Sequence, residues 1–115
     1  MKLYTSYFAR IGSSPKAVSI TVRKPPWFKG RHCPELSPSW DLVSSLKNGS
    51  ITEAQYRFGF MQLINERHIN FQKLAEQLGN GSILLCYEKP SKFCHRHIVA
   101  ECFCDSGIEI EEMEL

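Results

Sequence analysis

The sequence predicts a small three-layer α/β domain with a mainly parallel sheet, on three observations. Segments that suit strands stand near both ends of the chain, and segments with helical periodicity stand between them. The run ILLCY at residues 83–87 is continuously apolar, which is typical of a strand buried on both faces of a parallel sheet. The chain has 115 residues, enough for one hydrophobic core and too few for two. We therefore expect residues 1–115 to form a single domain.

Two strands are predicted in the N-terminal quarter. Residues 2–8 are rich in aromatic and β-favouring types, and residues 17–22 place β-branched side chains at alternate positions. Residues 10–16 contain glycine, serine and proline, so they form the predicted connection between the strands. Pro25 and Pro26 end the second strand, because proline has no amide proton to donate to a sheet.

Three helices are predicted in the middle of the chain. The first covers 37–47 and opens with Ser-Pro, since serine caps free amides and proline is tolerated at the first helical position. We expect Trp40, near its start, to pack in the core. The second helix covers 52–67 and opens with a capping box. A shorter third helix covers 70–79, with an asparagine at its start and a glycine at its end.

A further helix and an edge strand are predicted after the central strand. Pro90 ends that strand, and Ser91 is the predicted cap of a helix that runs to about Cys104. Isoleucines alternate with glutamates at residues 108–110, which suits a short edge strand protected by charge.

Five short motifs, spread over nearly the whole chain, resemble the domain-of-unknown-function family numbered 488. They are YTSYF at 4–8, PWFKG at 26–30, LSPSW at 36–40, LLCYEKP at 84–90 and FCHRH at 93–97. The resemblance implies an intracellular bacterial or phage α/β protein of Rossmann-like build. It implies no catalytic residue, because the activity of the family is not established.

The composition favours a soluble, cytoplasmic protein. Hydrophobic residues make up 43% and charged residues 23% of the chain, and the net charge of +2 is too small to argue for nucleic acid by itself. The N-terminus lacks the apolar region of a signal peptide, and no run approaches the roughly 20 apolar residues of a membrane helix. We therefore expect no membrane contact, and five cysteines present as reduced thiols.

The predicted site lies at the carboxyl edge of the sheet, where open α/β sheets bind ligands. A helix N-terminus offers unpaired amides and about half a positive charge, and arginine suits phosphate or carboxylate. The leading hypothesis is a small anionic ligand, such as a nucleotide or a sugar phosphate, bound at the N-terminus of the last helix. The predicted ligand-binding residues are Ser6, Tyr7, Trp27, Lys29 and Arg96. The alternative for Arg96 is a structural ion pair with Glu88 or Glu101.

Three residues are candidates for catalysis, namely Cys94, His95 and Glu88. A thiol at a helix N-terminus, beside histidine and arginine, should have a lowered pKa and act as a nucleophile. Glu88 could act as a general base or nucleophile in glycosyl transfer on a nucleoside. The alternatives are a buried structural cysteine and a solvated ion pair between Glu88 and Lys89. The sequence does not decide whether the protein is an enzyme.

A second interpretation is a non-catalytic binding or accessory protein, of a phage or its host, that engages a protein or nucleic-acid partner. Trp27 and Phe28 stand among Lys24, Lys29 and Arg31, a composition that suits base stacking with phosphate contacts. The same aromatic pair could instead fold back as a lid over the core.

No metal site and no cofactor are predicted. Cys94 and His97 stand at i, i+3 spacing, and His32 and Cys33 could join them from a distance. The chain lacks the Cys-x-x-Cys and His-Glu-x-x-His patterns of common zinc sites, so this spacing is weak support.

Overall fold

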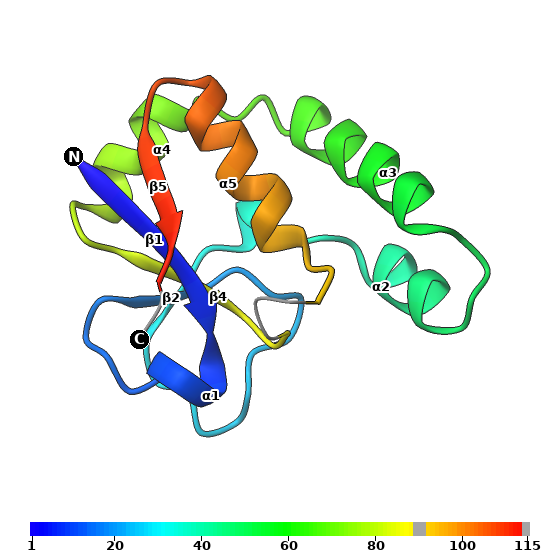
Figure 1. Ribbon diagram of the computed structural model, residues 1–115, viewed down its shortest axis with the longest axis horizontal. Helices are drawn as coiled ribbons and strands as arrows, with labels where there is room; N and C mark the ends of the chain where they lie inside the picture. The colour runs from blue at the N-terminus through cyan, green and yellow to red at the C-terminus, as the bar shows by residue number, and fades with distance from the viewer. Residues whose placement is uncertain (89–91, 114–115) are drawn as a thin grey trace.

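The computed structural model describes residues 1–88 and 92–113. These residues form one five-stranded sheet. Helices pack on the sheet (Figure 1). The strand order is β3-β2-β4-β1-β5, and every neighbouring pair is parallel. The predicted α/β class is confirmed, and the fold is consistent with a Rossmann-like build. The strands are β1 (Lys2–Tyr7), β2 (Ala17–Ser19), β3 (Arg31–His32), β4 (Ile83–Cys86) and β5 (Glu109–Glu112).

The two faces of the sheet are covered unequally. The helices are α1 (Phe8–Ile11), α2 (Trp40–Lys47), α3 (Glu53–Glu66), α4 (Phe71–Leu78) and α5 (His95–Asp105), with a short 3-10 helix at Pro34–Leu36. The larger core packs α3, α4 and α5 against one face of the sheet, and α2 and α3 extend beyond its edge (Figure 1). The other face carries a thin layer, made by α1 and the loop that holds Phe28.

β4 lies at the centre of the sheet and is buried along its whole length. Leu84 belongs to the larger core, while Ile83 and Leu85 belong to the smaller one. Successive side chains of a strand point to opposite faces, so a strand covered on both sides must be apolar throughout. This confirms the prediction made from the run at residues 83–87.

The end signals of α3 and α4 were predicted correctly. Thr52 and Gln55 form the capping box of α3. The amide of Thr52 donates to Oε1 of Gln55 at 2.8 Å, and the amide of Gln55 donates to Oγ1 of Thr52 at 3.1 Å. The side chain of Asn70 accepts from the amide of Lys73 at the start of α4. Gly79 ends α4 with φ of 95°, a conformation that glycine adopts without strain.

Two predicted helix starts were wrong. α2 begins at Trp40 and is capped by Ser39, because the hydroxyl of Ser37 donates instead to the carbonyl of Pro34. Trp40 is therefore at the first helical position and is 56% exposed, not in the core. α5 begins at His95, later than expected, and the predicted cap at Ser91 lies outside the described residues.

Two strands also differ from the prediction. β2 ends at Ser19 rather than near residue 22, and β3 was not predicted. A two-residue strand is too short to show the alternation of side chains by which strands are recognised.

Arg96 on α5 is fully buried and joins three strands. Its Nε and Nη2 each donate to an oxygen of the Glu112 carboxylate on β5, at 3.0 Å. Its Nη1 donates to the carbonyl of Glu88 and to the sulfur of Cys86, at 2.5 and 2.8 Å. The hydroxyl of Thr5 on β1 also donates to Glu112, at 2.7 Å. The guanidinium thus connects α5 to the end of β4 and, through Glu112, to β5 and β1.

None of the helices in the described part of the chain is long and apolar enough to cross a membrane.

Replacing Arg96 by methionine tests how much the fold depends on this ion pair. The change leaves a mostly buried carboxylate without its cation, so we expect Arg96→Met to lower the free energy of unfolding by about 3–5 kcal/mol. Arg57→Met is the matched control, because the Arg57–Glu101 pair is about half exposed on both sides and should contribute less than about 1 kcal/mol. Urea denaturation measures both. Equal losses in the two variants would contradict the structural role given to Arg96.

Candidate functional site

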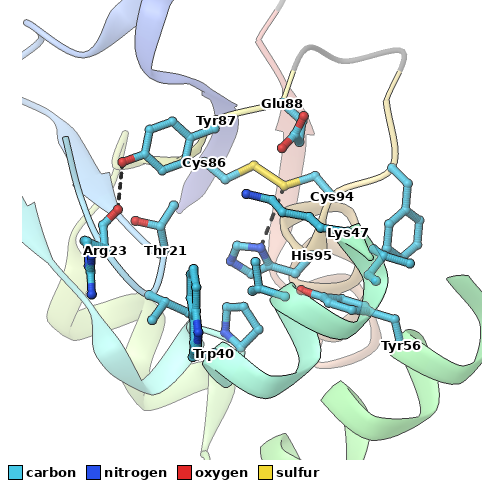
Figure 2. Close-up of a pocket in the computed structure, with 15 residues that line it drawn as sticks. Thr21, Arg23, Trp40, Lys47, Tyr56, Cys86, Tyr87, Glu88, Cys94 and His95 are labelled. Carbon is cyan, nitrogen blue, oxygen red and sulfur yellow. Dashed lines mark hydrogen bonds between the residues drawn. A yellow bond between two sulfur atoms is a disulfide. The ribbon is translucent and has the colours of Figure 1, made fainter. Parts of the chain in front are cut away.

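A cavity of about 340 Å³ opens at the carboxyl ends of β2 and β4 (Figure 2). Its walls come from the segments after these two strands, from α2 and the first turn of α3, and from the start of α5. Parallel strands bring their carboxyl ends to one edge of the sheet, and loops at that edge are where open α/β folds bind ligands.

Aromatic side chains form much of the cavity wall. Trp40 and Tyr87 are 56% and 52% exposed, although they are large apolar residues. The hydroxyl of Tyr87 donates to the carbonyl of Arg23 at 2.7 Å, which holds this ring in place. The Arg23 guanidinium lies 5.9 Å from the centre of the Trp40 ring, within the range of a cation–π contact. Exposed aromatic rings around a concave space are typical of a binding surface.

Three charged side chains border the cavity. Arg23 and Lys47 contribute positive charge, and Glu88 is the acidic residue of the lining. Within residues 1–88 and 92–113, neither Arg23 nor Lys47 takes part in a salt bridge. Both cations are therefore available to an anionic ligand.

A buried part of the lining holds Cys86, Cys94 and His95, which lie side by side (Figure 2). Cys86 and Cys94 form a disulfide. The expectation that all five cysteines are free thiols is thus wrong for this pair, because the fold brings the end of β4 beside the residue that precedes α5. Cys33, Cys102 and Cys104 are free. A bonded sulfur has no thiolate form, so Cys94 is not a nucleophile in this state.

His95 is held in one tautomer. Its Nε2 lies 2.5 Å from the carbonyl oxygen of Ile20, and a carbonyl can only accept, so Nε2 carries the proton. The lone pair of Nδ1 is then directed toward the sulfur of Cys94, 3.7 Å away. Burial lowers the pKa of His95 to about 4, and the imidazole is neutral at pH 7.

The cavity brings together the three predicted catalytic residues and none of the predicted ligand-binding residues. Glu88, Cys94 and His95 all border it. Arg96 does not border it, and its three nitrogens all donate to protein atoms. Arg96 does form a structural ion pair, but with Glu112 rather than with Glu88 or Glu101, the two partners expected from the sequence.

Ser6 and Tyr7 lie within the sheet rather than at the cavity. Ser6 is completely buried, and its hydroxyl has no hydrogen-bond partner among the described residues. Tyr7 stands opposite Cys86 in the register of β1 and β4. Both residues end a strand at the expected edge, but they are not among those that line the cavity.

Trp27 and Lys29 border a separate hollow of about 650 Å³, which is also lined by residues 12–15. Trp27 is 56% exposed and packs edge-on against Phe8, with ring centres 6.2 Å apart. Phe28 is buried in the smaller core. The two aromatic side chains therefore do not form a joint stacking platform, and only Trp27 is available to a partner.

Sequence reasoning missed the residues that form the open part of the cavity. These are the exposed residues Arg23, Trp40, Lys47 and Tyr87; the buried Thr21 also lines the cavity and was not predicted. Tyr87 directly follows the central strand, a position that could have been recognised. Trp40 and Lys47 come from α2, and their arrival at the sheet edge depends on how that helix packs.

The burial of His95 predicts a pH-dependent stability. The unfolded histidine takes up a proton below pH 6.5, whereas the folded one does so only near pH 4, so the unfolded state binds more protons between these values. We expect the free energy of unfolding to fall by about 3 kcal/mol from pH 7 to pH 4 through this group. Urea denaturation without reductant measures it, with the disulfide intact.

His95→Gln is the matched control, because glutamine can still donate to the Ile20 carbonyl but does not titrate. The difference between the two pH profiles isolates the histidine from the carboxylates that titrate in the same range. Parallel profiles for both proteins would show that His95 is not buried in its neutral form.

Comparison with known proteins identifies a family. The family model described as "Active DUF488-N3 subclade" matches residues 8–107. This range contains every residue that lines the cavity. No match was found among the curated proteins or the solved structures. The resemblance inferred from the five motifs is confirmed, and the chain belongs to the DUF488 family.

Proposed function

We propose that the protein binds a small, nucleotide-like anion in the cavity at the ends of β2 and β4. One observation carries the proposal: the exposed rings of Trp40 and Tyr87 surround the same space as Arg23 and Lys47, two cations that form no salt bridge with any described residue. Aromatic faces stack on nucleobases with about 1–3 kcal/mol per base, and cations bind phosphate through charge-assisted hydrogen bonds. The arrangement supplies both interactions.

The size of the cavity narrows the class of ligand. Its volume of about 340 Å³ is near the lower end of the roughly 300–1,000 Å³ that is usual for ligand pockets. This space suits a mononucleotide or a smaller molecule better than a dinucleotide. In this proposal Arg23 and Lys47 take the anion-binding role that the sequence analysis gave to Arg96.

The redox state of the sulfur pair decides whether Cys94 offers a nucleophile to the cavity. After reduction of the disulfide, Nδ1 of His95 is placed to accept the proton of the Cys94 thiol, since the two atoms lie 3.7 Å apart. Glu88 borders the cavity and is a second acid–base group within it. In the oxidised state the cavity binds the proposed anion, but Cys94 offers no nucleophile.

Tryptophan fluorescence tests the proposal, because the chain has only two tryptophans. Trp27→Phe leaves Trp40 as the sole reporter, and we expect its emission to change when nucleoside monophosphates are added. Nucleosides that lack the phosphate should bind more weakly. Replacing Arg23 or Lys47 by glutamine should raise the dissociation constant about tenfold, which corresponds to about 1.4 kcal/mol.

Lys29→Gln, made in the same Trp27→Phe background, is the matched control because Lys29 borders the other hollow. It should leave the dissociation constant unchanged. An emission that no member of the panel alters, or equal affinities in the Arg23, Lys47 and Lys29 variants, would argue against nucleotide binding in this cavity.

A second candidate function rests on the exposure of Trp27 beside Lys29 and residues 12–15. In this alternative the hollow engages a protein or a single-stranded nucleic acid without catalysis. Fluorescence anisotropy with a labelled single-stranded oligonucleotide distinguishes the two functions. Loss of binding in Trp27→Ala but not in Trp40→Ala would favour the second candidate, and the opposite pattern would favour the cavity.

A further inference from the structure

We infer that the reduced protein binds one zinc ion through the sulfurs of Cys86 and Cys94 and Nδ1 of His95. The inference does not depend on the identity of the ligand in the cavity. The ligand set differs from the weak one weighed from the sequence, which paired Cys94 with His97 rather than with Cys86 and His95.

The three donor atoms lie close together, and the spacing between the Cys94 sulfur and Nδ1 of His95 already suits a zinc ion. The three ligand atoms lie within 4.8 Å of one another. Zinc–sulfur bonds of about 2.3 Å and zinc–nitrogen bonds of about 2.0–2.1 Å place tetrahedral donors about 3.3–3.8 Å apart. The separation of 3.7 Å between the Cys94 sulfur and Nδ1 of His95 falls in this range.

The backbone leaves room for the ion between the two cysteines. Their Cα atoms are 7.4 Å apart, whereas disulfides usually span about 4.4–6.8 Å. Once the bond is reduced, the sulfurs can separate by side-chain rotation while β4 and α5 stay in place. Cys86 ends β4 and Cys94 directly precedes α5, so the packing of these two elements holds the site together.

The surroundings of the three ligands are those of a metal site. A metal-binding histidine almost always donates its second ring N–H to a carbonyl or a carboxylate, and His95 donates from Nε2 to the carbonyl of Ile20. Arg96 donates from Nη1 to the sulfur of Cys86, which favours a thiolate there. The charge of Arg96 is balanced by Glu112, so it does not add a net positive charge beside the ion.

The site would have three protein ligands and one open position. All three ligands border the cavity, so we expect a fourth ligand to reach the ion from there. Three protein ligands with an open position are the usual arrangement of catalytic zinc, whereas structural zinc has four. The open position would accept water or an oxygen atom of a bound molecule, within the cavity that Glu88 also borders.

Zinc binding and the disulfide exclude each other, because both use the same two sulfurs. A dithiol reductant gives two electrons and two protons to the Cys86–Cys94 bond, which yields two thiols, and the reductant becomes a disulfide. Each thiol then releases its proton to solvent as its sulfur binds the ion. Zinc occupancy is thus controlled by the thiol redox state.

Cobalt(II) is the spectroscopic probe for this site. Protein purified without a histidine tag is reduced, freed of reductant under nitrogen and titrated with cobalt. We expect one cobalt per chain, thiolate-to-cobalt charge-transfer bands in the near ultraviolet and the strong visible bands of four-coordinate cobalt. Zinc should displace the cobalt and abolish both sets of bands. The oxidised protein should show neither.

Variants assign the ligands. Cys86→Ser, Cys94→Ser and His95→Gln should each weaken cobalt binding by more than tenfold, and the two serine variants should also lose charge-transfer intensity. Cys104→Ser is the matched control, because Cys104 is an exposed free cysteine, and it should keep the wild-type spectrum and affinity. Circular dichroism checks the folding of each variant.

Alkylation of the wild-type protein needs no variant and tests the site independently. Zinc should protect Cys86 and Cys94 of the reduced protein from alkylation, while Cys104 continues to react, as read by mass spectrometry of peptides. The inference is overturned if the reduced protein gives no charge-transfer bands, if Cys86→Ser and Cys94→Ser keep the wild-type spectrum, or if zinc leaves the alkylation of both cysteines unchanged.

Discussion

The buried ion pair between Arg96 and Glu112 is the interaction on which the arrangement of the site depends. Arg96 is the second residue of α5. It binds the Glu88 carbonyl, just after β4, and the Glu112 carboxylate at the end of β5, and so fixes the start of the helix against both strands. Cys94 and His95 directly precede Arg96 in the chain, so their positions over β4 follow from where the guanidinium is held. A buried arginine that loses its carboxylate would destabilise the helix and the cavity wall together.

The residues in and next to the site form a buried layer, whose polar groups bind other protein atoms, and an exposed layer, whose side chains are open to solvent. The buried layer holds the sulfur pair, a neutral histidine and the paired Arg96, and its polar groups are satisfied by protein atoms. The exposed layer holds aromatic rings and unpaired cations, which are free to contact a ligand. Burial thus separates the charge that stabilises the fold from the charges to which we assign the proposed ligand.

The sulfur pair connects the proposed ligand site to the proposed metal site. In the oxidised state the cavity offers rings and cations only. The two sulfurs and Nδ1 of His95 border the cavity together, so in the reduced state we expect them to bind a proton, an ion or a substrate atom. The two proposals are tested separately, because nucleotide binding involves Trp40 and Arg23 whereas metal binding involves Cys86 and Cys94.

The sequence by itself determined the elements whose causes are local. The capping box at Thr52 and the fully buried strand at 83–86 depend on side chains within a few residues of one another. Only the tertiary structure decided the roles within the site. Consecutive helical residues are about 100° apart around the axis, so Arg96 turns into the protein while His95 borders the cavity. The cations that border the cavity are Arg23 and Lys47 rather than Arg96. They come from other parts of the chain, so their position at the cavity depends on packing between segments far apart in the sequence.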